Sequence, residues 1–508
     1  MNVIGLLSKV QNYTNAQSKN YWLTRFIILR LLGFVYLFAF LSLAFQVLPL
    51  LGHNGLLPAD LFLQRVGAQV DTGGAFSVLP SLFWFHISDT WLVVLAWLGV
   101  LLSLVVLVGY ANVPILFILW FLYLSFVHIG QLWYGYGWEI QLCETGFLAM
   151  FLVPLWEVRP FPRLAPPVPV IWLFRWLAFR IYLGAGLIKI RGDECWRKLA
   201  CLFYHYETQP IPGPLSPFFH FLPHWANQVG VLYNHLAELV LPFLMFWPRV
   251  LRLISGSLMV LFQLVLILSG NLSFLNWLTL LPVLACFDDR FLAHLLPQGL
   301  VKKAEKAKKK AVIRNKVAWI VLFIITLLSI PVIQNLFSSG QAMNSSFDAW
   351  ELVNTYGAFG SVGKERGELV LEGTSDATIT NETVWKAYEI PYKPGDPNKF
   401  LPIIAPYQPR IAWQIWFAAM QHPQDNPWLI HLIWKLLHND PNVLNLIAYN
   451  PFPDQPPKFI RVSYYKYKFA PLGSDHVWDR MYMGEWLPPL SEENEGLQRF
   501  IVVNGWEV

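Results

Sequence analysis

The sequence predicts a polytopic α-helical membrane protein, with about nine transmembrane helices, that carries a C-terminal α+β domain outside the membrane. The composition is strongly apolar: of 508 residues, 55% are hydrophobic and only 14% are charged, whereas about a quarter of the residues of a typical soluble domain are charged. The apolar residues gather in runs that are long enough to cross a bilayer. After the last of these runs the pattern changes to short alternating segments, which predict a folded extramembrane domain.

Nine apolar runs are candidates for transmembrane helices, because about 20 apolar residues are needed to cross the hydrocarbon core. They cover residues 26–50, 91–109, 113–129, 139–156, 170–190, 229–247, 251–268, 272–287 and 317–336. Many of the 24 tryptophans flank these runs, where the amphipathic indole ring is suited to the headgroup layer. Together the runs define a multi-pass transmembrane domain over residues 26–336.

Basic residues indicate how these spans are oriented, because four clusters of them fall on one predicted face. The clusters are Lys9, Lys19 and Arg25; Arg159 and Arg163; Arg249 and Arg252; and the lysine-rich residues 302–316. The positive-inside rule assigns this face to the cytoplasm. The N-terminal segment 1–25 and the basic loop 288–316 are therefore predicted to be cytoplasmic, and the loops 51–90 and 191–228 are predicted to be outer loops.

An odd number of spans places the C-terminal domain, residues 337–508, on the lumenal or periplasmic side. The membrane would be that of the endoplasmic reticulum in a eukaryote and the inner or plasma membrane in a bacterium. The excess positive charge, +5 for the whole chain, is explained by residues 302–316. It therefore marks topology, and the sequence predicts the lipid bilayer and no nucleic acid as a partner.

Two kinds of periodicity mark the C-terminal domain. Residues 368–371 and 459–469 alternate between apolar and polar side chains, as half-buried strands do. Residues 411–420, 428–437 and 443–448 have the spacing of amphipathic helices. This mixture predicts the α+β class.

Ionisable residues inside predicted spans require an explanation, because they are costly in the bilayer. The helical rise places Arg180 and Glu238 at similar depths, ~15 Å and ~14 Å below the outer ends of their spans, which predicts an intramembrane ion pair. Glu144 also falls inside a span. A pair that fixes helix register is favoured over a functional pair. A transporter that uses both charges has the least support, because no inverted repeat of interrupted helices is visible.

The densest group of polar residues follows the fifth span, in the second outer loop. Its members are Asp193, Trp196, His205, Tyr206 and Glu207. Lys189, at the outer mouth of the span, either extends toward water or is a partly desolvated general base, and the first interpretation is favoured. Cys195 and Cys201 can form a disulfide if their Cα atoms lie within about 7 Å.

Common signatures of catalysis and of metal or cofactor binding are absent from the sequence. It contains no phosphate-binding glycine loop, no nucleophile elbow, no zinc-protease helix motif and no zinc-type cysteine spacing. We therefore predict neither a metal nor a cofactor.

Several strings along the chain resemble a known family. They are residues 21–26 (YWLTRF), 186–193 (GLIKIRGD), 205–210 (HYETQP), 269–278 (SGNLSFLNWL), 286–289 (CFDD), 354–361 (NTYGAFGS) and 450–452 (NPF). These strings resemble the lipase maturation factor family nearly from end to end. The resemblance implies a non-enzymatic, chaperone-like protein that helps secreted homodimeric lipases reach their active state, so that the implied partner is a secreted lipase or another exported client.

A shorter string supports an alternative. Residues 185–189 (AGLIK) are similar to a string in vitamin-K-dependent γ-carboxylases, whose lysine is a catalytic base. That resemblance implies a membrane enzyme in which Lys189 is the general base. The later part of the carboxylase chain is not recognisable here.

Four aromatic residues of the C-terminal domain are candidates for client binding: Tyr356, Phe359, Trp413 and Trp416. Aromatic side chains dominate the energetics of protein interfaces. The alternative, which is favoured for any single one of them, is that the residue belongs to the core of its own domain.

Overall fold

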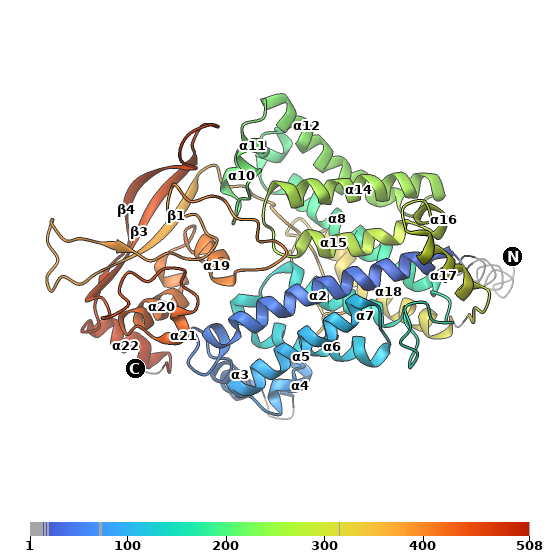
Figure 1. The fold of residues 1–508 in the computed structure, drawn as a ribbon, viewed down its shortest axis with the longest axis horizontal. Helices are drawn as coiled ribbons and strands as arrows, with labels where there is room; N and C mark the ends of the chain where they lie inside the picture. The colour runs from blue at the N-terminus through green and yellow to red at the C-terminus, as the bar shows by residue number, and fades with distance from the viewer. Residues whose placement is uncertain (1–13, 15–16, 18–19, 71–73, 314, 507–508) are drawn as a thin grey trace.

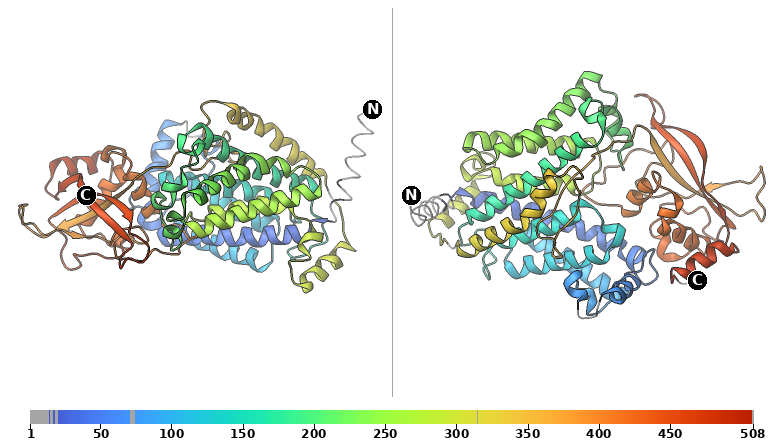
Figure 2. Two further views of the ribbon diagram at one scale, coloured as in Figure 1. Left: turned by 90° about the horizontal axis from the view of Figure 1, so that it is seen from above. Right: turned by 180° about the vertical axis from the view of Figure 1, so that it is seen from behind.

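The computed structural model describes residues 14, 17, 20–70, 74–313 and 315–506. The molecule is elongated, with a helical bundle at one end and a mixed α/β part at the other (Figure 1). Two further views show the same division, with the long helices running roughly along the long axis of the molecule (Figure 2).

Helices occupy all nine predicted apolar runs, but they differ in length. In chain order they are α2 (Trp22–Leu51), α5 (Asp89–Val108), α6 (Val113–Ile129), α7 (Gly137–Met150), α8 (Val168–Arg191), α12 (His224–His235) with η4 (Leu236–Val240) and α13 (Leu241–Leu244), α14 (Arg249–Ser269), α15 (Leu275–Val283) with η5 (Leu284–Cys286), and α18 (Lys316–Phe337). Among the described residues, α2, α5, α8, α14 and α18 are long and apolar enough to cross a membrane. The chain is thus a multi-pass membrane protein, and the expected count of nine spans is not confirmed.

Prolines accompany the breaks in the fourth, sixth and eighth apolar runs. The fourth run turns after Met150, ahead of Pro154. The sixth run contains a π-helical turn followed by Pro242, and α15 contains Pro282 close to its end. A proline removes one backbone donor and clashes with the preceding turn, so that hydropathy alone overestimates the length of these helices.

Local sequence fixes the start and the packing of the first spans. The Ser88 side chain accepts a hydrogen bond from the Trp91 N–H at the start of α5, and Asn112 does the same for Ile115 at the start of α6, as N-cap residues do. A Cβ atom on Gly33 of α2 would lie 2.5 Å from the backbone nitrogen of Leu107 in α5. Glycine therefore permits the close approach of these two helices.

The loops between the spans lie at opposite ends of the bundle. Loop 51–90 contains α3 (Ala59–Gln69), α4 (Ala75–Val78) and η2 (Leu82–Trp84), and loop 191–228 contains α9 (Glu194–Arg197), α10 (Leu202–Thr208) and α11 (Ser216–His220). Both loops lie at the end that faces the C-terminal domain, whereas α16 (Asp289–Leu292) and α17 (Gln298–Lys308) of the basic loop lie at the other end (Figure 1). Which membrane face each end occupies stays a prediction.

The C-terminal domain contains an antiparallel sheet of four strands. They are β1 (Arg366–Thr374), β2 (Lys386–Ala387), β3 (Phe459–Phe469) and β4 (Trp478–Leu490), in the order β2-β1-β3-β4. The register pairs Leu369 of β1 with Tyr464 of β3, and Tyr467 of β3 with Arg480 of β4. The β1 strand is central and nearly fully buried.

Helices pack beside this sheet: α19 (Arg410–Ala418), α20 (Pro427–Leu437), α21 (Pro441–Leu444) and α22 (Glu495–Val503), with η6 (Pro423–Asp425) between the first two. Strands and helices are found at four of the five predicted segments of the domain, whereas the predicted helix 443–448 is helical only in its first two residues, as the end of α21. The α+β prediction for this part is thus supported, but β4 and α22 were not predicted.

Candidate functional site at the junction of the bundle and the C-terminal domain

A cavity lies where the bundle meets the C-terminal domain. Its volume is about 410 Å³. Bundle residues Trp138 and Ile181, His205 of the outer loop, and Phe359 and Trp416 of the C-terminal domain are among those that line it. We call this cavity the junction chamber. Its lining is mainly apolar, with a few polar groups, as in typical ligand pockets.

The four aromatic candidates occupy different places at the chamber. Trp413 is 3% exposed and Tyr356 is 4% exposed, so both belong to the core. Trp413 packs edge to face on Trp138, with 5.0 Å between ring centroids. Phe359 and Trp416 are only partly buried and line the chamber, so they remain candidates for contact with a client.

The segment 354–363, which follows the last bundle helix, lies directly against α8. A Cβ atom on Gly184 would overlap the carbonyl oxygen of Tyr356, and one on Gly192 would overlap that of Gly360. The glycines of α8 therefore allow the backbone of this segment to touch the helix.

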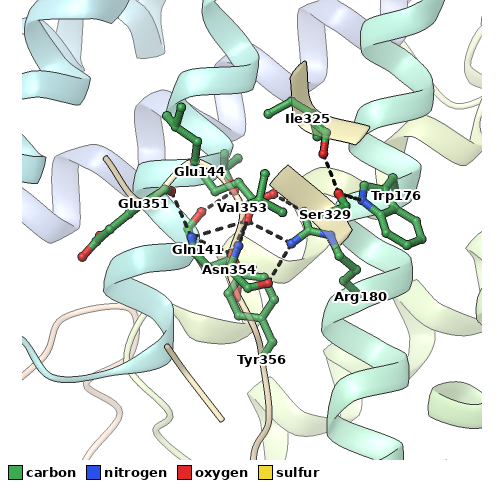
Figure 3. A network of polar contacts seen from close by, with 12 residues as sticks. Gln141, Glu144, Trp176, Arg180, Ile325, Ser329, Glu351, Val353, Asn354 and Tyr356 are labelled. Atoms are coloured by element: carbon green, nitrogen blue, oxygen red, sulfur yellow. Dashed lines mark hydrogen bonds and ion pairs between the residues drawn. The ribbon is translucent and has the colours of Figure 1, made fainter. Parts of the chain in front are cut away.

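Glu144 of α7 is the centre of a buried polar network that joins the bundle to this segment (Figure 3). Its carboxylate pairs with the Arg180 guanidinium and accepts hydrogen bonds from the Tyr356 hydroxyl, at 2.7 Å, and from the Asn354 N–H, at 3.1 Å. Arg180 also donates to the Asn354 carbonyl oxygen at 2.8 Å. The two buried charges of the network are thus paired with each other, as a buried charge requires.

The predicted pairing of Arg180 with Glu238 is therefore wrong. Arg180 points toward α7 and pairs with Glu144, while Glu238 pairs with Lys189, at 2.5 Å between Nζ and Oε1. Lys189 lies nine residues after Arg180 in α8, or about 13 Å along the helix axis. The helical rise predicts how deep each charged residue lies in the membrane, but not the direction in which its side chain points.

Lys189 does not extend to water, so this favoured interpretation is also wrong. Its side chain is 5% exposed, and its ammonium group lies 5.2 Å from the centre of the Trp196 ring. Glu238 accepts a further hydrogen bond from Asn234 at 3.0 Å. The Lys189 ammonium group is therefore held in a buried ion pair inside the bundle.

Beneath the junction chamber lies a second cavity of about 130 Å³, lined in part by Lys189 and Glu238. His205 and Phe359 line both cavities, and their rings meet edge to face at 4.8 Å. Burial, together with the positive charge of Lys189, lowers the pKa of His205 to about 4. The imidazole between the two cavities is therefore neutral at neutral pH.

The outer-loop residues hold the segment 354–363 from the other side. The Asp193 carboxylate accepts hydrogen bonds from the N–H groups of Cys195 and Val362. The Trp196 indole N–H donates to the carbonyl oxygen of Phe359 at 2.8 Å. The loop therefore fixes the position of one wall of the chamber.

Cys195 and Cys201 form a disulfide, with 4.8 Å between their Cα atoms. Asp193 lies close enough to both sulfurs for the three residues to hold a metal ion. The disulfide leaves neither sulfur as a thiolate, which is the form that binds metals.

Tyr206 and Glu207 connect the same loop to its surroundings. The Tyr206 ring stacks on Phe219, and the Glu207 carboxylate accepts a hydrogen bond from the Phe469 N–H at 2.8 Å. The Arg366 guanidinium donates to the carbonyl oxygen of Glu207 at 2.8 Å. Glu207 is thus part of the contact between the loop and the sheet, whereas Tyr206 packs within the loop.

One further contact across the junction was not predicted from the sequence. Arg410, at the start of α19, pairs with Glu139 of α7 at 2.9 Å, and both side chains are fully buried. The available signal was Glu139 itself, an ionisable residue at the edge of a predicted span. Its partner could not be found, because it lies 271 residues away.

Comparisons with known proteins agree along nearly the whole chain. Residues 23–294 match the family described as lipase maturation factor transmembrane domain, and residues 352–488 match the lipase maturation factor C-terminal domain. The protein named lipase maturation factor 1 from Bos taurus is 46% identical, over 93% of this chain and 90% of its own length. The Homo sapiens protein of the same name is 43% identical, over 96% and 90%.

A second human relative is named lipase maturation factor 2. It is 29% identical, over 92% of this chain and 83% of its own length. No solved structure matches the chain.

Proposed function

Because the chain belongs to the lipase maturation factor family, we propose that it is a membrane-bound maturation factor that assists the folding, assembly and activation of secreted lipases. The observation that supports this proposal is that the family match covers both the bundle and the C-terminal domain. The junction chamber lies between these two matched parts. We propose that it is the site where the client is held.

The chamber would bind apolar side chains that a lipase exposes before it has packed or dimerised. Met420, at its rim, is 58% exposed, and Phe359 and Trp416 are partly exposed beside it. Methionine adapts its shape to different partners, and aromatic residues contribute most to contact energy. Such a lining can bind different clients, because it recognises exposed apolar surface and does not require one particular client sequence.

The polar contacts around the chamber would keep its walls in place. Glu144 with Arg180, and Lys189 with Glu238, hold α8 against its neighbours, and the outer loop holds Phe359. A preformed site binds more tightly, because less conformational freedom is lost on binding. In this proposal Lys189 is structural, and the protein is not an enzyme.

We place the chamber on the lumenal or periplasmic side, where secreted proteins fold. The disulfide Cys195–Cys201 at its wall is consistent with an oxidising compartment. The N-terminus and the basic helix α17 would then be cytoplasmic. In a eukaryotic cell the membrane would be that of the endoplasmic reticulum.

The test is the specific activity of a secreted homodimeric lipase, coexpressed in cells that lack their own maturation factor. We compare no factor, the wild-type chain, Met420→Glu and the control Ile379→Glu. Ile379 is also exposed but lies in the β1–β2 loop, away from the chamber. The wild-type chain and Ile379→Glu should raise the activity per mass of secreted lipase. Met420→Glu should raise it less at equal abundance, because a charge at the rim disfavours apolar contacts.

If the wild-type chain leaves lipase activity unchanged, the proposed function is wrong for this chain. If Met420→Glu raises lipase activity as much as the wild-type chain does, then the client does not bind at the chamber rim. Lys189→Arg keeps the ion pair but cannot be deprotonated near neutral pH. If this variant is folded and abundant yet has lost all function, then the non-enzymatic interpretation is wrong.

A further inference from the structure

The outer edge of the sheet is formed by β4, which pairs with β3 alone in the described structure. Figure 1 shows it as the outermost strand of the sheet. An edge strand carries a row of backbone N–H and C=O groups that no neighbouring strand satisfies. This edge is long, since β4 has 13 residues.

The first half of β4 contains no proline, and its charged residues, Asp479 and Arg480, lie at its start. Residues 478–482 pair in regular register with β3, whereas register shifts interrupt the pairing of the residues after 482. Pro488 and Pro489, which discourage pairing, occur only near the end of the strand. The open edge is therefore residues 479–483, which pair regularly with β3 as far as Tyr482 and end at a bulge at Met483.

After Asp479 and Arg480, the side chains of this open edge are apolar. Met481, Tyr482 and Met483 are consecutive and are 56%, 50% and 52% exposed. In a strand, consecutive side chains point to opposite faces, so apolar surface is present on both sides of the edge. Three exposed apolar residues in sequence are unfavourable in a designed surface unless they bind something.

The edge is continuous with the junction chamber. The Trp486 indole N–H, three residues beyond the open edge, donates to the carbonyl oxygen of Gln421 at 2.9 Å. Gln421 follows Met420, which is at the chamber rim. A chain paired along β4 could therefore also reach the chamber with a side chain.

We propose that residues 479–483 bind an extended segment of the partly folded client, which adds as a further strand to the sheet. This inference rests on the proposed function and specifies what part of the client is recognised. Backbone hydrogen bonds would provide contacts that do not depend on the client's sequence, and the exposed side chains would add apolar contacts. Suitable segments are client strands that have not yet paired within the client's own sheet.

A second copy of this chain is a less suitable occupant. In antiparallel self-pairing centred on Tyr482, Asp479 of each copy would lie opposite Glu485 of the other. Like charges that are directly opposite each other destabilise a strand pair. The client segment is therefore favoured over self-association.

The experiment measures hydrogen exchange at the amides of residues 479–483 in the full-length protein, reconstituted in nanodiscs. The probe is a homodimeric secreted lipase diluted from guanidinium chloride, with the native lipase dimer as its control. Exchange should slow by about tenfold or more with the partly folded lipase only, because strand addition bonds the outward-facing N–H groups. Unchanged exchange with bound lipase would overturn the proposal, and slowing without lipase that grows with protein concentration would assign the edge to a second copy.

A pair of variants tests the same edge in cells. Met481→Lys with Met483→Lys places charges that block edge pairing, and Ile379→Lys with Val384→Lys is the control at other exposed apolar residues. The edge variant should lower lipase specific activity by about threefold or more relative to this control. If wild-type protein raises activity and the edge variant does so equally, then only the edge proposal fails. If wild-type protein raises nothing, then the proposed function fails first.

Discussion

Lys189 and Glu238 lie within 2.5 Å of each other, and both side chains are about 5% exposed. The pair is a buried ion pair. In such pairs, removing one partner lowers the stability of the fold more than replacing both partners does. The sequence shows that Lys189 and Glu238 are ionisable residues in or near predicted spans, but it does not show that they pair with each other. Partner choice depends on the rotation of α8 about its axis, which hydropathy does not determine.

Lys189→Met should destabilise the protein, because it leaves the Glu238 carboxylate buried without a counter-charge. The expected loss is about 3–5 kcal/mol. The double variant Lys189→Met with Glu238→Gln should recover more than half of that loss. The measurement is thermal unfolding in detergent. A single variant as stable as the wild type would show that water reaches Glu238.

Tyr356→Phe tests the network of Glu144 in the same way. The variant keeps the ring but removes the hydroxyl that donates to the carboxylate, at a cost of about 1.5–3 kcal/mol for a hydrogen bond to a charged group. Tyr449→Phe, at an exposed position, should change stability by less than about 0.5 kcal/mol. Equal effects of the two substitutions would contradict the role that we assign to the hydroxyl.

His205 should make the protein less stable in mild acid. Burial, together with Lys189, lowers the pKa of His205 to about 4, from an ordinary value of about 6.5 in the unfolded chain. Between these two values the unfolded state binds more protons, so that the free energy of unfolding falls as pH decreases, by about 2 kcal/mol at pH 5. His205→Gln should reduce this dependence in melting curves recorded from pH 7 to pH 5. An unchanged slope would assign the acid sensitivity to other groups.

At the scale of elements, the sequence predicted those whose pattern has a clear period. The β3 strand alternates and is half-buried, and it was found at residues 459–469 as expected. The β4 strand is exposed on both faces over residues 479–483, so its sequence has no period of two to recognise. The short helix α7 and the segment around η4 show the converse, since apolar composition continues past Met150, where α7 ends, and through the π-helical turn of η4.

The disulfide between Cys195 and Cys201 supports one element, the outer loop against segment 354–363. Replacing both cysteines by serine should destabilise the protein by about 2 kcal/mol, as estimated for so short a closed loop. It should also increase hydrogen exchange around Val362, whose N–H donates to Asp193. Faster exchange across the whole chain at equal stability would indicate a different role.

At the scale of the whole molecule, the helix α17 and the C-terminal domain lie at opposite ends (Figure 2). The basic clusters and the odd number of predicted spans predicted this separation, but no local pattern could show how the two halves meet. The contacts that join them are between residues far apart in the chain, such as Glu144 with Asn354 and Glu139 with Arg410. Such pairs become visible only once the fold is known.

Single cysteines at Lys303 and Phe400 should be labelled from opposite sides of the membrane by an impermeant maleimide. Both positions are exposed. The native cysteines give little background, because Cys143 and Cys286 are buried and the other two are bonded to each other. Labelling of both positions from the same side would refute the predicted topology.

The pairing of Glu139 with Arg410 also imposes an order on biosynthesis. A ribosome adds about 5–20 residues per second, so the 271 residues between the two take roughly 15 to 55 s to synthesise. During that time Glu139 has the Tyr123 hydroxyl as a neighbour, but not yet its counter-charge. The charge of Glu139 is therefore without its counter-charge until the last fifth of the chain is made, so that the membrane part completes its assembly only after the C-terminal domain has begun to fold.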